Sequence, residues 1–165
     1  MKSLKSELTH VIVKLETRDV DDIARIHAAC FDEAWNARIL SRILAMPGAF
    51  AIGARPGGPD GDLAGFAIGR VDTDGCELLS LAVAPAGRGQ GLGAMLLDAV
   101  LVRAGAVKVR KFFLEVAENN IAALTLYKTR GLAQVGRRPN YYENKDGSHT
   151  DALTMRVNLA EIISS

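Results

Sequence analysis

A glycine-rich segment in the middle of the chain restricts the possible folds more than any other feature. Residues 81–93 read LAVAPAGRGQGLG and pass from an apolar, strand-like run directly into a helix that shows an apolar face at Leu92, Met95 and Leu96. Glycine occupies every second position of the last seven of these residues. Such glycines permit positive φ angles and close approach of a ligand, while the helix start presents unpaired N–H groups and a positive dipole end. The segment therefore predicts a phosphate-binding turn.

Two other phosphate-binding motifs fit this turn less well. Gly89, Gly91 and Ala94 match the dinucleotide fingerprint, with Glu115 or Glu118 as the later ribose partner. A dinucleotide fold, however, needs repeated parallel units that usually begin at the domain start, whereas this turn follows antiparallel strands in mid-chain. A nucleoside-triphosphate loop is excluded because no Gly-Lys-Ser or Gly-Lys-Thr follows the glycines.

The periodicity of apolar residues along the rest of the chain predicts an α/β fold. The expected order is strand 11–15, a helix from about residue 20, a helix over 39–44, strands 49–54, 63–71 and 76–83, the helix from Leu92, strand 111–117, a helix capped by Asn119 and ended by Gly131, and closing strands 132–135 and 152–159. Because strand 111–117 is nearly all apolar, it is expected at the centre of the sheet with both faces covered. The chain is expected to form one domain, residues 1–165, with a mixed, mostly antiparallel sheet flanked by helices.

The charge balance and the short apolar runs indicate which partners and which cellular location are expected for the protein. The 20 Lys and Arg residues nearly equal the 19 Asp and Glu residues, which argues against direct nucleic-acid binding. The apolar run at 11–13 is too short for an export signal, and the run 92–102 is interrupted by Asp98, so a cytoplasmic protein without membrane contact is expected. Cys30 and Cys76 stand far apart and the three histidines are scattered, so we expect core thiols and no metal site.

Motifs in the second half of the chain resemble a known enzyme family. Arg88-x-x-Gly91-x-Gly93, preceded by Leu81-Ala82-Val83-x-Pro85, resembles the acetyl-CoA signature of the GCN5-related N-acetyltransferase (GNAT) superfamily. Further motifs resemble the branch that acetylates the N-terminal alanine of a small-subunit ribosomal protein: Leu114-Glu115-Val116, Asn119-Asn120, Ala123-Leu124-x-Leu126-Tyr127, Gly131-Leu132 and Asn140-Tyr141-Tyr142. The likeness spans about residues 76–157. Where that branch has Pro-Trp-Ser, this chain has Glu33-Ala34-Trp35-Asn36, which leaves the acceptor open.

The resemblance implies acetyl-CoA as co-substrate and a splayed central pair of strands. The strand that ends at Val83 would diverge from the next one, so that the pantetheine amides pair with its free edge. The backbone N–H of Val83 would bind the developing oxyanion. The implied cofactor-binding residues are Leu81, Ala82, Val83, Arg88, Gly89, Gln90, Gly91, Leu92, Gly93, Ala94, Asn120 and Tyr127. Asn120 would bond the pantetheine arm, and Asn119 would serve only as the helix cap.

Two side chains are candidates for proton transfer. Glu115 lies in an apolar strand, where burial would raise its pKa, and we predict it to be the general base, acting directly or through water. The alternative is a glutamate at a strand end that reaches solvent or pairs with a lysine. The resemblance assigns Tyr127 to protonate the leaving thiolate, and the alternative is a helix tyrosine packed on the sheet with its hydroxyl at the surface.

Three aromatic residues are candidates for contact with the acceptor. Tyr141 and Tyr142 are expected in a loop between the last two strands, where they would grip a peptide N-terminus, although alternate packing in a strand is as compatible with the sequence. Trp35, the only tryptophan, takes a comparable place near the first helices, with core packing as its alternative role. Arg137 and Arg138 are expected to form only a solvated face.

The leading functional hypothesis is acetyl transfer to the N-terminal α-amine of a protein, such as a ribosomal protein, by direct attack in a ternary complex. An α-amine with a pKa of about 7.7–8.0 needs only a modest base, unlike a lysine amine with a pKa of about 10.4. No cysteine lies in the matched motifs to form an acyl-enzyme. A small-molecule amine acceptor and a non-catalytic acyl-CoA-binding module are the alternatives, and the protein is expected to be a monomer or a homodimer.

Overall fold

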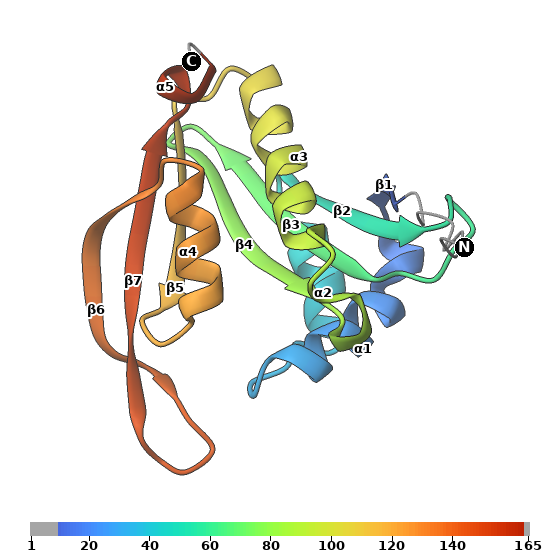
Figure 1. The fold of residues 1–165 in the computed structure, drawn as a ribbon, viewed down its shortest axis with the longest axis horizontal. Helices are drawn as coiled ribbons and strands as arrows, with labels where there is room; N and C mark the ends of the chain where they lie inside the picture. The colour runs from blue at the N-terminus through green and yellow to red at the C-terminus, as the bar shows by residue number, and fades with distance from the viewer. Residues whose placement is uncertain (1–9, 164–165) are drawn as a thin grey trace, which may run out of the picture.

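The computed structural model describes residues 10–163, which form a seven-stranded sheet with helices on both faces (Figure 1). The strands are β1 (His10–Leu15), β2 (Ala49–Pro56), β3 (Gly65–Asp72), β4 (Gly75–Val83), β5 (Lys111–Ala117), β6 (Ala133–Glu143) and β7 (His149–Asn158). The helices are η1 (Thr17–Asp19), α1 (Val20–Cys30), α2 (Ala37–Leu44), η2 (Pro85–Gly87), α3 (Leu92–Ala106), α4 (Ile121–Thr129) and α5 (Leu159–Ile163). The order β1-β2-β3-β4-β5-β7-β6 contains one parallel pair, β4 with β5. The mixed, mostly antiparallel sheet is thereby confirmed.

The parallel pair β4 and β5 is joined over only a short stretch. Their register holds three residue pairs, from Cys76 opposite Phe112 to Leu78 opposite Leu114. Beyond Leu78 the two strands diverge, as Figure 1 shows in the widening space between β4 and β5. This divergence confirms the splayed strand pair that the family resemblance implied.

A bulge in β4 lies at the point of divergence. Gly69 of β3 faces Leu78, whereas Ile68 faces Ser80, so Leu79 is the extra residue of β4. A bulge exchanges the two faces of a strand. Accordingly Leu78 and, beyond the bulge, Val83 pack toward α3 and α4, while Leu79 packs on the opposite side.

Two apolar clusters hold the helices to the two faces of the sheet. On one face, α3 packs on β2, β3 and β4, and it shares with α4 and β5 one cluster that includes Leu96, Val100 and Phe112, all fully buried. On the other face, α1 and α2 bury Ile23 and Leu40 against β2 and β3. Because β5 to β7 have no such helix on this second face, it stays accessible beside the splay.

This arrangement corrects the prediction for β5. The strand is central in the sheet, as expected, but it is not covered on both faces. Phe112, Leu114 and Val116 are buried beneath the helices, whereas Phe113 and Glu115 on the other face are half-buried. The apolar composition of β5 thus reflects one helix-covered face and one partly open face.

Two further local predictions are wrong. The N-cap of α4 is Asn120 and not Asn119, since the Asn120 side chain accepts a hydrogen bond from Ala123 N at 3.2 Å. Tyr141 and Tyr142 lie within β6 and not in a loop, because β6 continues to Glu143.

The end of α4 at Gly131 is confirmed: this glycine has φ +85°, a conformation that favours glycine. Among the described helices, none has the length and apolar character needed to cross a bilayer.

Candidate active site

The edge of β4 that faces the splay carries backbone groups without a strand partner. Ala84 N donates to Ala64 O at 2.8 Å, so Val83 and its neighbour Gly65 form a non-hydrogen-bonded antiparallel pair. The N–H and C=O of Val83 therefore point away from β3, as do those of Leu81, two residues earlier. Within the described chain, β5 pairs with β4 only as far as Leu78. An extended ligand with amide groups can therefore add to this edge as a strand would.

A thiol from α1 contacts this edge. Cys30 Sγ donates to Val83 O at 3.4 Å, and Arg88 Nη2 donates to the same sulfur at 3.5 Å. Cys30 is half-buried and joins α1, β4 and the glycine turn, so its expected role as core filler is too narrow. Cys76 is buried as expected, and burial raises the pKa of its thiol to about 12. The contact with Cys30 occupies the Val83 carbonyl and leaves the Val83 N–H for a ligand.

The glycine turn has the open backbone that a phosphate site requires. Gly89 and Gly91 have φ angles of +79° and +77°, and a Cβ atom built on either would meet nothing within 4 Å. Gly91 is the N-cap of α3, whose first intrahelical bond from the helix body runs from Met95 N to Gly91 O. The N–H groups of residues 92–94 have no intrahelical acceptor at such a helix start and can bind an anion. The turn therefore fits a pyrophosphate.

Glu115 lies on the partly open face of β5 and is bonded to an arginine. Arg138 Nε lies 2.9 Å from Glu115 Oε1, and the two side chains are 61% and 21% exposed. Of the alternatives that the sequence allowed, an ion pair is therefore present, with arginine in place of lysine. Arg138 is not merely solvated.

Tyr127 reaches the splay from the opposite face of the sheet. It is buried, with 6% of the residue exposed, and burial raises the pKa of its phenol to about 12, with a smaller contribution from Tyr142. Within residues 10–163, no hydrogen-bond partner is found for its hydroxyl. The hydroxyl therefore keeps its proton at neutral pH and remains available as a donor.

Tyr142 interacts electrostatically with both proton-transfer candidates, Glu115 and Tyr127. Burial raises its pKa, with further contributions from Glu115 and then Tyr141, while Tyr142 in turn contributes to the raised pKa of Tyr127. The three side chains come from β5, β6 and α4. The fold thus brings Glu115, Tyr127 and Tyr142 into one neighbourhood around the splay.

The paired tyrosines of β6 follow a bulge. Arg138 faces Ala152 and Tyr142 faces Thr150, so β6 has two extra residues between them. Within the bulge, Asn140 adopts φ +54° and its N–H donates to Asp151 Oδ1 at 2.9 Å. The rings of Tyr141 and Tyr142 lie 5.0 Å apart at 88°, with Tyr141 52% exposed and Tyr142 half-buried. One tyrosine therefore faces solvent while the other faces the site.

Trp35 is held by a histidine that the sequence did not single out. The backbone N–H of Trp35 donates to His27 Nδ1 at 2.9 Å, and the centroids of the two stacked rings lie 4.8 Å apart. His27 is buried, and burial lowers its pKa to about 4, so the neutral ring can accept this bond. The one available signal was the place of His27 on the apolar face of α1. Trp35 itself packs against the cluster beneath α1 and α2.

Asn120 has one of its two polar groups already in use. Its Oδ1 caps α4 through the N–H of Ala123, while its amide nitrogen has no hydrogen-bond partner within residues 10–163 and can donate to a ligand. The sequence pattern predicted the cap at Asn119, and the family resemblance implied the ligand contact at Asn120. In the structure Asn120 is the cap.

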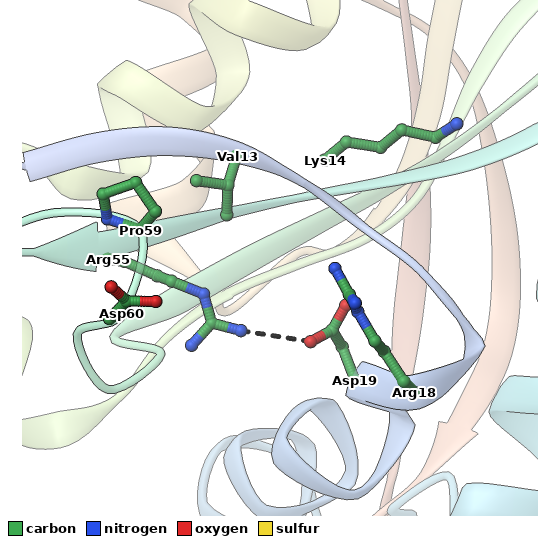
Figure 2. A pocket seen from close by; sticks show the side chains of 7 residues that line it. All are labelled: Val13, Lys14, Arg18, Asp19, Arg55, Pro59 and Asp60. Carbon is green, nitrogen blue, oxygen red and sulfur yellow. Dashed lines mark hydrogen bonds and ion pairs between the residues drawn. The ribbon is translucent and has the colours of Figure 1, made fainter.

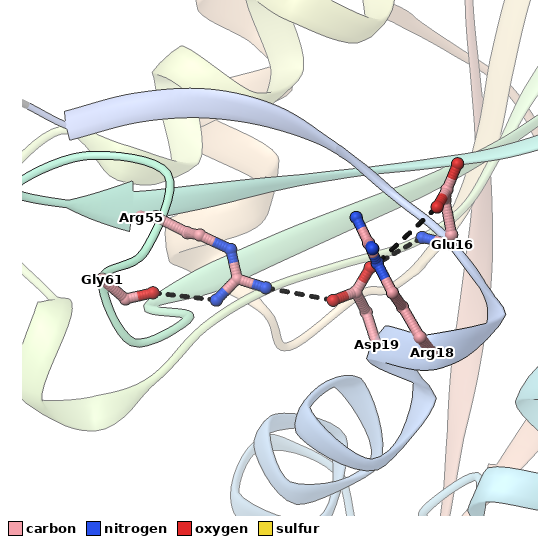
Figure 3. A network of polar contacts seen from close by, with 5 residues as sticks. All are labelled: Glu16, Arg18, Asp19, Arg55 and Gly61. Carbon is pink, nitrogen blue, oxygen red and sulfur yellow. Dashed lines mark hydrogen bonds and ion pairs between the residues drawn. The ribbon is translucent and has the colours of Figure 1, made fainter.

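A surface pocket of about 390 Å³ lies at the other end of the sheet, beside β1 (Figure 2). It is lined by Val13, Lys14, Arg18, Asp19, Arg55, Pro59 and Asp60, none of them a candidate site residue. At its wall Arg55 pairs with Asp19 at 3.1 Å and donates to Gly61 O at 2.8 Å, as Figure 3 shows. Asp19 also accepts from Glu16 N at 2.8 Å. These bonds fasten the start of α1 to the β2–β3 turn.

Comparison with known proteins identifies the family. The model of the GNAT acetyltransferase family matches residues 20–132, more than half of the chain. The chain belongs to the GNAT family of acetyltransferases. This match confirms the family resemblance and the enzyme class, an N-acetyltransferase, that the motifs predicted.

Several relatives of this GNAT protein are acetyltransferases. The N-alpha-acetyltransferase RimI of Mycobacterium tuberculosis is 37% identical over 147 residues, which cover 86% of this chain and 88% of the relative. The ribosomal protein bS18-alanine N-acetyltransferase of Escherichia coli is 36% identical over 61% of this chain and 68% of its own.

Solved structures show the same fold. The crystal structure of the ribosomal-protein-S18-alanine N-acetyltransferase from E. coli superposes with a TM-score of 0.83 and 28% identity, covering 92% of this chain and 94% of that one. Arabidopsis thaliana NAA60 in complex with acetyl-CoA has a TM-score of 0.79 at 20% identity, covering 92% of this chain and 99% of its own.

Proposed function

We propose that this GNAT protein transfers the acetyl group of acetyl-CoA to the N-terminal α-amine of a protein, with a ribosomal protein as the leading acceptor. The observation that carries the proposal is the unpaired edge of β4 leading into the open glycine turn at the start of α3. A ligand with amide groups followed by a pyrophosphate needs these two sites in this order. The names of the relatives support the choice of acceptor.

The backbone geometry supports the cofactor-binding residues that the family resemblance implied. Leu81, Ala82 and Val83 provide the strand edge for the pantetheine arm, and the turn from Arg88 through Gly89, Gln90, Gly91, Leu92 and Gly93 to Ala94 surrounds the pyrophosphate. Asn120 would add a bond from its amide nitrogen. Arg88 is already held by Cys30 at the beginning of the turn. When bound, acetyl-CoA supplies an activated thioester.

The proton-transfer roles follow from the placement of Glu115 and Tyr127 on the two faces of the sheet. Glu115, paired with Arg138 at 2.9 Å, takes the proton of the acceptor amine directly or through a water molecule. Tyr127, whose phenol keeps its proton, donates to the departing sulfur from the α4 side. The Val83 N–H, which points into the splay, donates to the carbonyl oxygen of the thioester.

The acceptor side is formed by aromatic residues on the partly open face. Tyr142 is half-buried near Glu115, and Tyr141 covers it from the solvent side. Trp35, in the α1–α2 connection, is the third acceptor candidate, and its backbone N–H is held by His27. Aromatic side chains beside a carboxylate suit a short extended peptide that ends in an amine.

The proposal is tested by thiol release from acetyl-CoA with two acceptor panels. One panel contains short peptides that begin with alanine or serine, and the other contains small primary amines such as polyamines, aminosugars and amino acids. Turnover of the peptides alone is expected. Turnover of the small amines alone would make the protein a metabolite-modifying enzyme, and tight CoA binding without any turnover would make it a non-catalytic binding module.

A further inference from the structure

A second carboxylate lies at the point where β4 and β5 separate. Glu77 of β4 belongs to the last stretch that pairs with β5, directly opposite Phe113. Side chains alternate along a strand, so Glu77, Phe113 and Glu115 occupy the same face of the sheet. From the spacing of strands and residues, the α-carbons of Glu77 and Glu115 are roughly 8 Å apart. The two carboxylates thus border the closed end of the splay on the acceptor side.

Glu77 is half-buried and has no bonded partner. No hydrogen bond or ion pair from residues 10–163 reaches its carboxylate. Burial raises the pKa of Glu77, and the next contributions come from Glu115 and Asp72. Arg70 and Arg138 act in the opposite direction and do not cancel the rise.

The two arginines that face Glu77 are bonded elsewhere. Arg70, its cross-strand neighbour on β3, donates its Nε to Pro47 O at 3.1 Å. Arg138 of β6 is bonded to Glu115 at 2.9 Å. An unpaired, partly desolvated carboxylate beside a second carboxylate is unfavourable by itself. A cation placed between the two would remove that cost.

We infer that Glu77 binds the positively charged amine of the acceptor before Glu115 deprotonates it. The inference rests on the proposed acetyl transfer, but it concerns the ammonium group and not the rest of the acceptor. Glu77 would hold the ammonium at the closed end of the splay, next to the base that receives its proton. The acetylated product carries no charge on this nitrogen, so the same contact would favour its release.

The test compares binding of an acceptor and of its own acetylated product. The best amine from either acceptor panel is titrated calorimetrically into the protein saturated with CoA, where no turnover occurs, and the N-acetyl form is titrated in the same way. With Glu77→Gln we expect the free amine to bind about tenfold more weakly and the N-acetyl form to bind within about twofold of the unaltered protein. Equal weakening of both ligands, or of neither, would overturn the inference.

Two further variants separate this role from a structural one. Asp74→Asn removes an exposed carboxylate from the turn before β4 and should leave both affinities unchanged. Arg70→Gln tests whether Glu77 serves only its cross-strand neighbour: in that case Arg70→Gln and Glu77→Gln would lower the melting temperature alike and spare the ratio of the two affinities. Turnover with small amines but not peptides would contradict the proposed acceptor and leave the Glu77 test intact. Failure of both panels would overturn both.

Discussion

The polar groups beside β1 are bonded to one another, whereas several polar groups at the splay between β4 and β5 have no partner among the described residues. At β1, the guanidinium of Arg55 is bonded to Asp19 and to Gly61 O, and Asp19 is bonded in turn to the backbone of Glu16. At the splay, the Val83 N–H, the Tyr127 hydroxyl and the Glu77 carboxylate have no partner among the described residues. Because these groups are not engaged within the described part of the protein, they can bond a ligand. The bonded groups beside β1 hold parts of the fold together, whereas the groups at the splay are available for the proposed reaction.

The largest expected effect of a substitution is on catalysis at the splay. Glu115→Gln keeps the shape of the side chain but cannot accept the amine proton, so we expect kcat to fall about 100-fold or more. Thiol release with the best acceptor measures it. The matched control is Glu118→Gln. Glu118 lies three residues after Glu115, and its carboxylate is paired with Arg137. Equal losses in the two variants would contradict a specific role for Glu115.

Tyr127→Phe should have the next largest effect. Phenylalanine fills the same buried space but cannot donate to the leaving sulfur, so kcat should fall about 10- to 100-fold with an unchanged melting temperature. The pH profile gives a second measurement. Because the raised pKa of about 12 keeps the phenol protonated below that pH, kcat should not decline between neutral pH and about pH 10 through loss of this proton. An unchanged kcat in Tyr127→Phe would remove the tyrosine from the mechanism.

Substitution of two glycines that share one backbone conformation compares the glycine turn before α3 with the β2–β3 turn directly. Gly91 in the cofactor turn and Gly57 in the β2–β3 turn have φ angles of +77° and +78°, and a Cβ on either meets nothing within 4 Å. Alanine at either position should therefore cost a similar amount of stability, about 1–2 kcal/mol. Only Gly91→Ala should weaken CoA binding, by about tenfold, as measured by calorimetry. Weaker CoA binding in both variants would argue against a phosphate site at Gly91.

The smallest effect on activity is expected at the β1 network. Arg55→Met removes an ion pair whose side chains are both 14% exposed, so we expect the free energy of unfolding to fall by about 1–3 kcal/mol. The kcat of the remaining folded protein should stay within about twofold of the original. Arg18→Met is the control, because its pair with Glu16 is 81% and 51% exposed and should contribute no measurable stability. Urea denaturation measures both, and a kcat loss in Arg55→Met would link this pocket to catalysis.

The parts of the fold that were predictable depend on short-range patterns. The apolar face of α3, the glycine turn before it and the stop of α4 at Gly131 are each encoded within a few residues, because helix periodicity and φ preference are local properties. The same local rules could not choose between Asn119 and Asn120 as the cap of α4, since both residues have the required side chain. The length of β6 was missed because its bulge at Asn140 interrupts the strand pattern.

The sequence by itself was enough to predict the enzyme family, which the family match confirms, and to propose a phosphate-binding turn and the proton-transfer candidates Glu115 and Tyr127. Only the tertiary structure decided which groups surround them. Arg138 meets Glu115 across β7, Cys30 meets Val83 across 53 positions of the chain, and His27 holds the Trp35 backbone. These contacts depend on strand register, on the β4 bulge and on the docking of α1, which no local pattern specifies. The same register left Glu77 without a partner at the closed end of the splay.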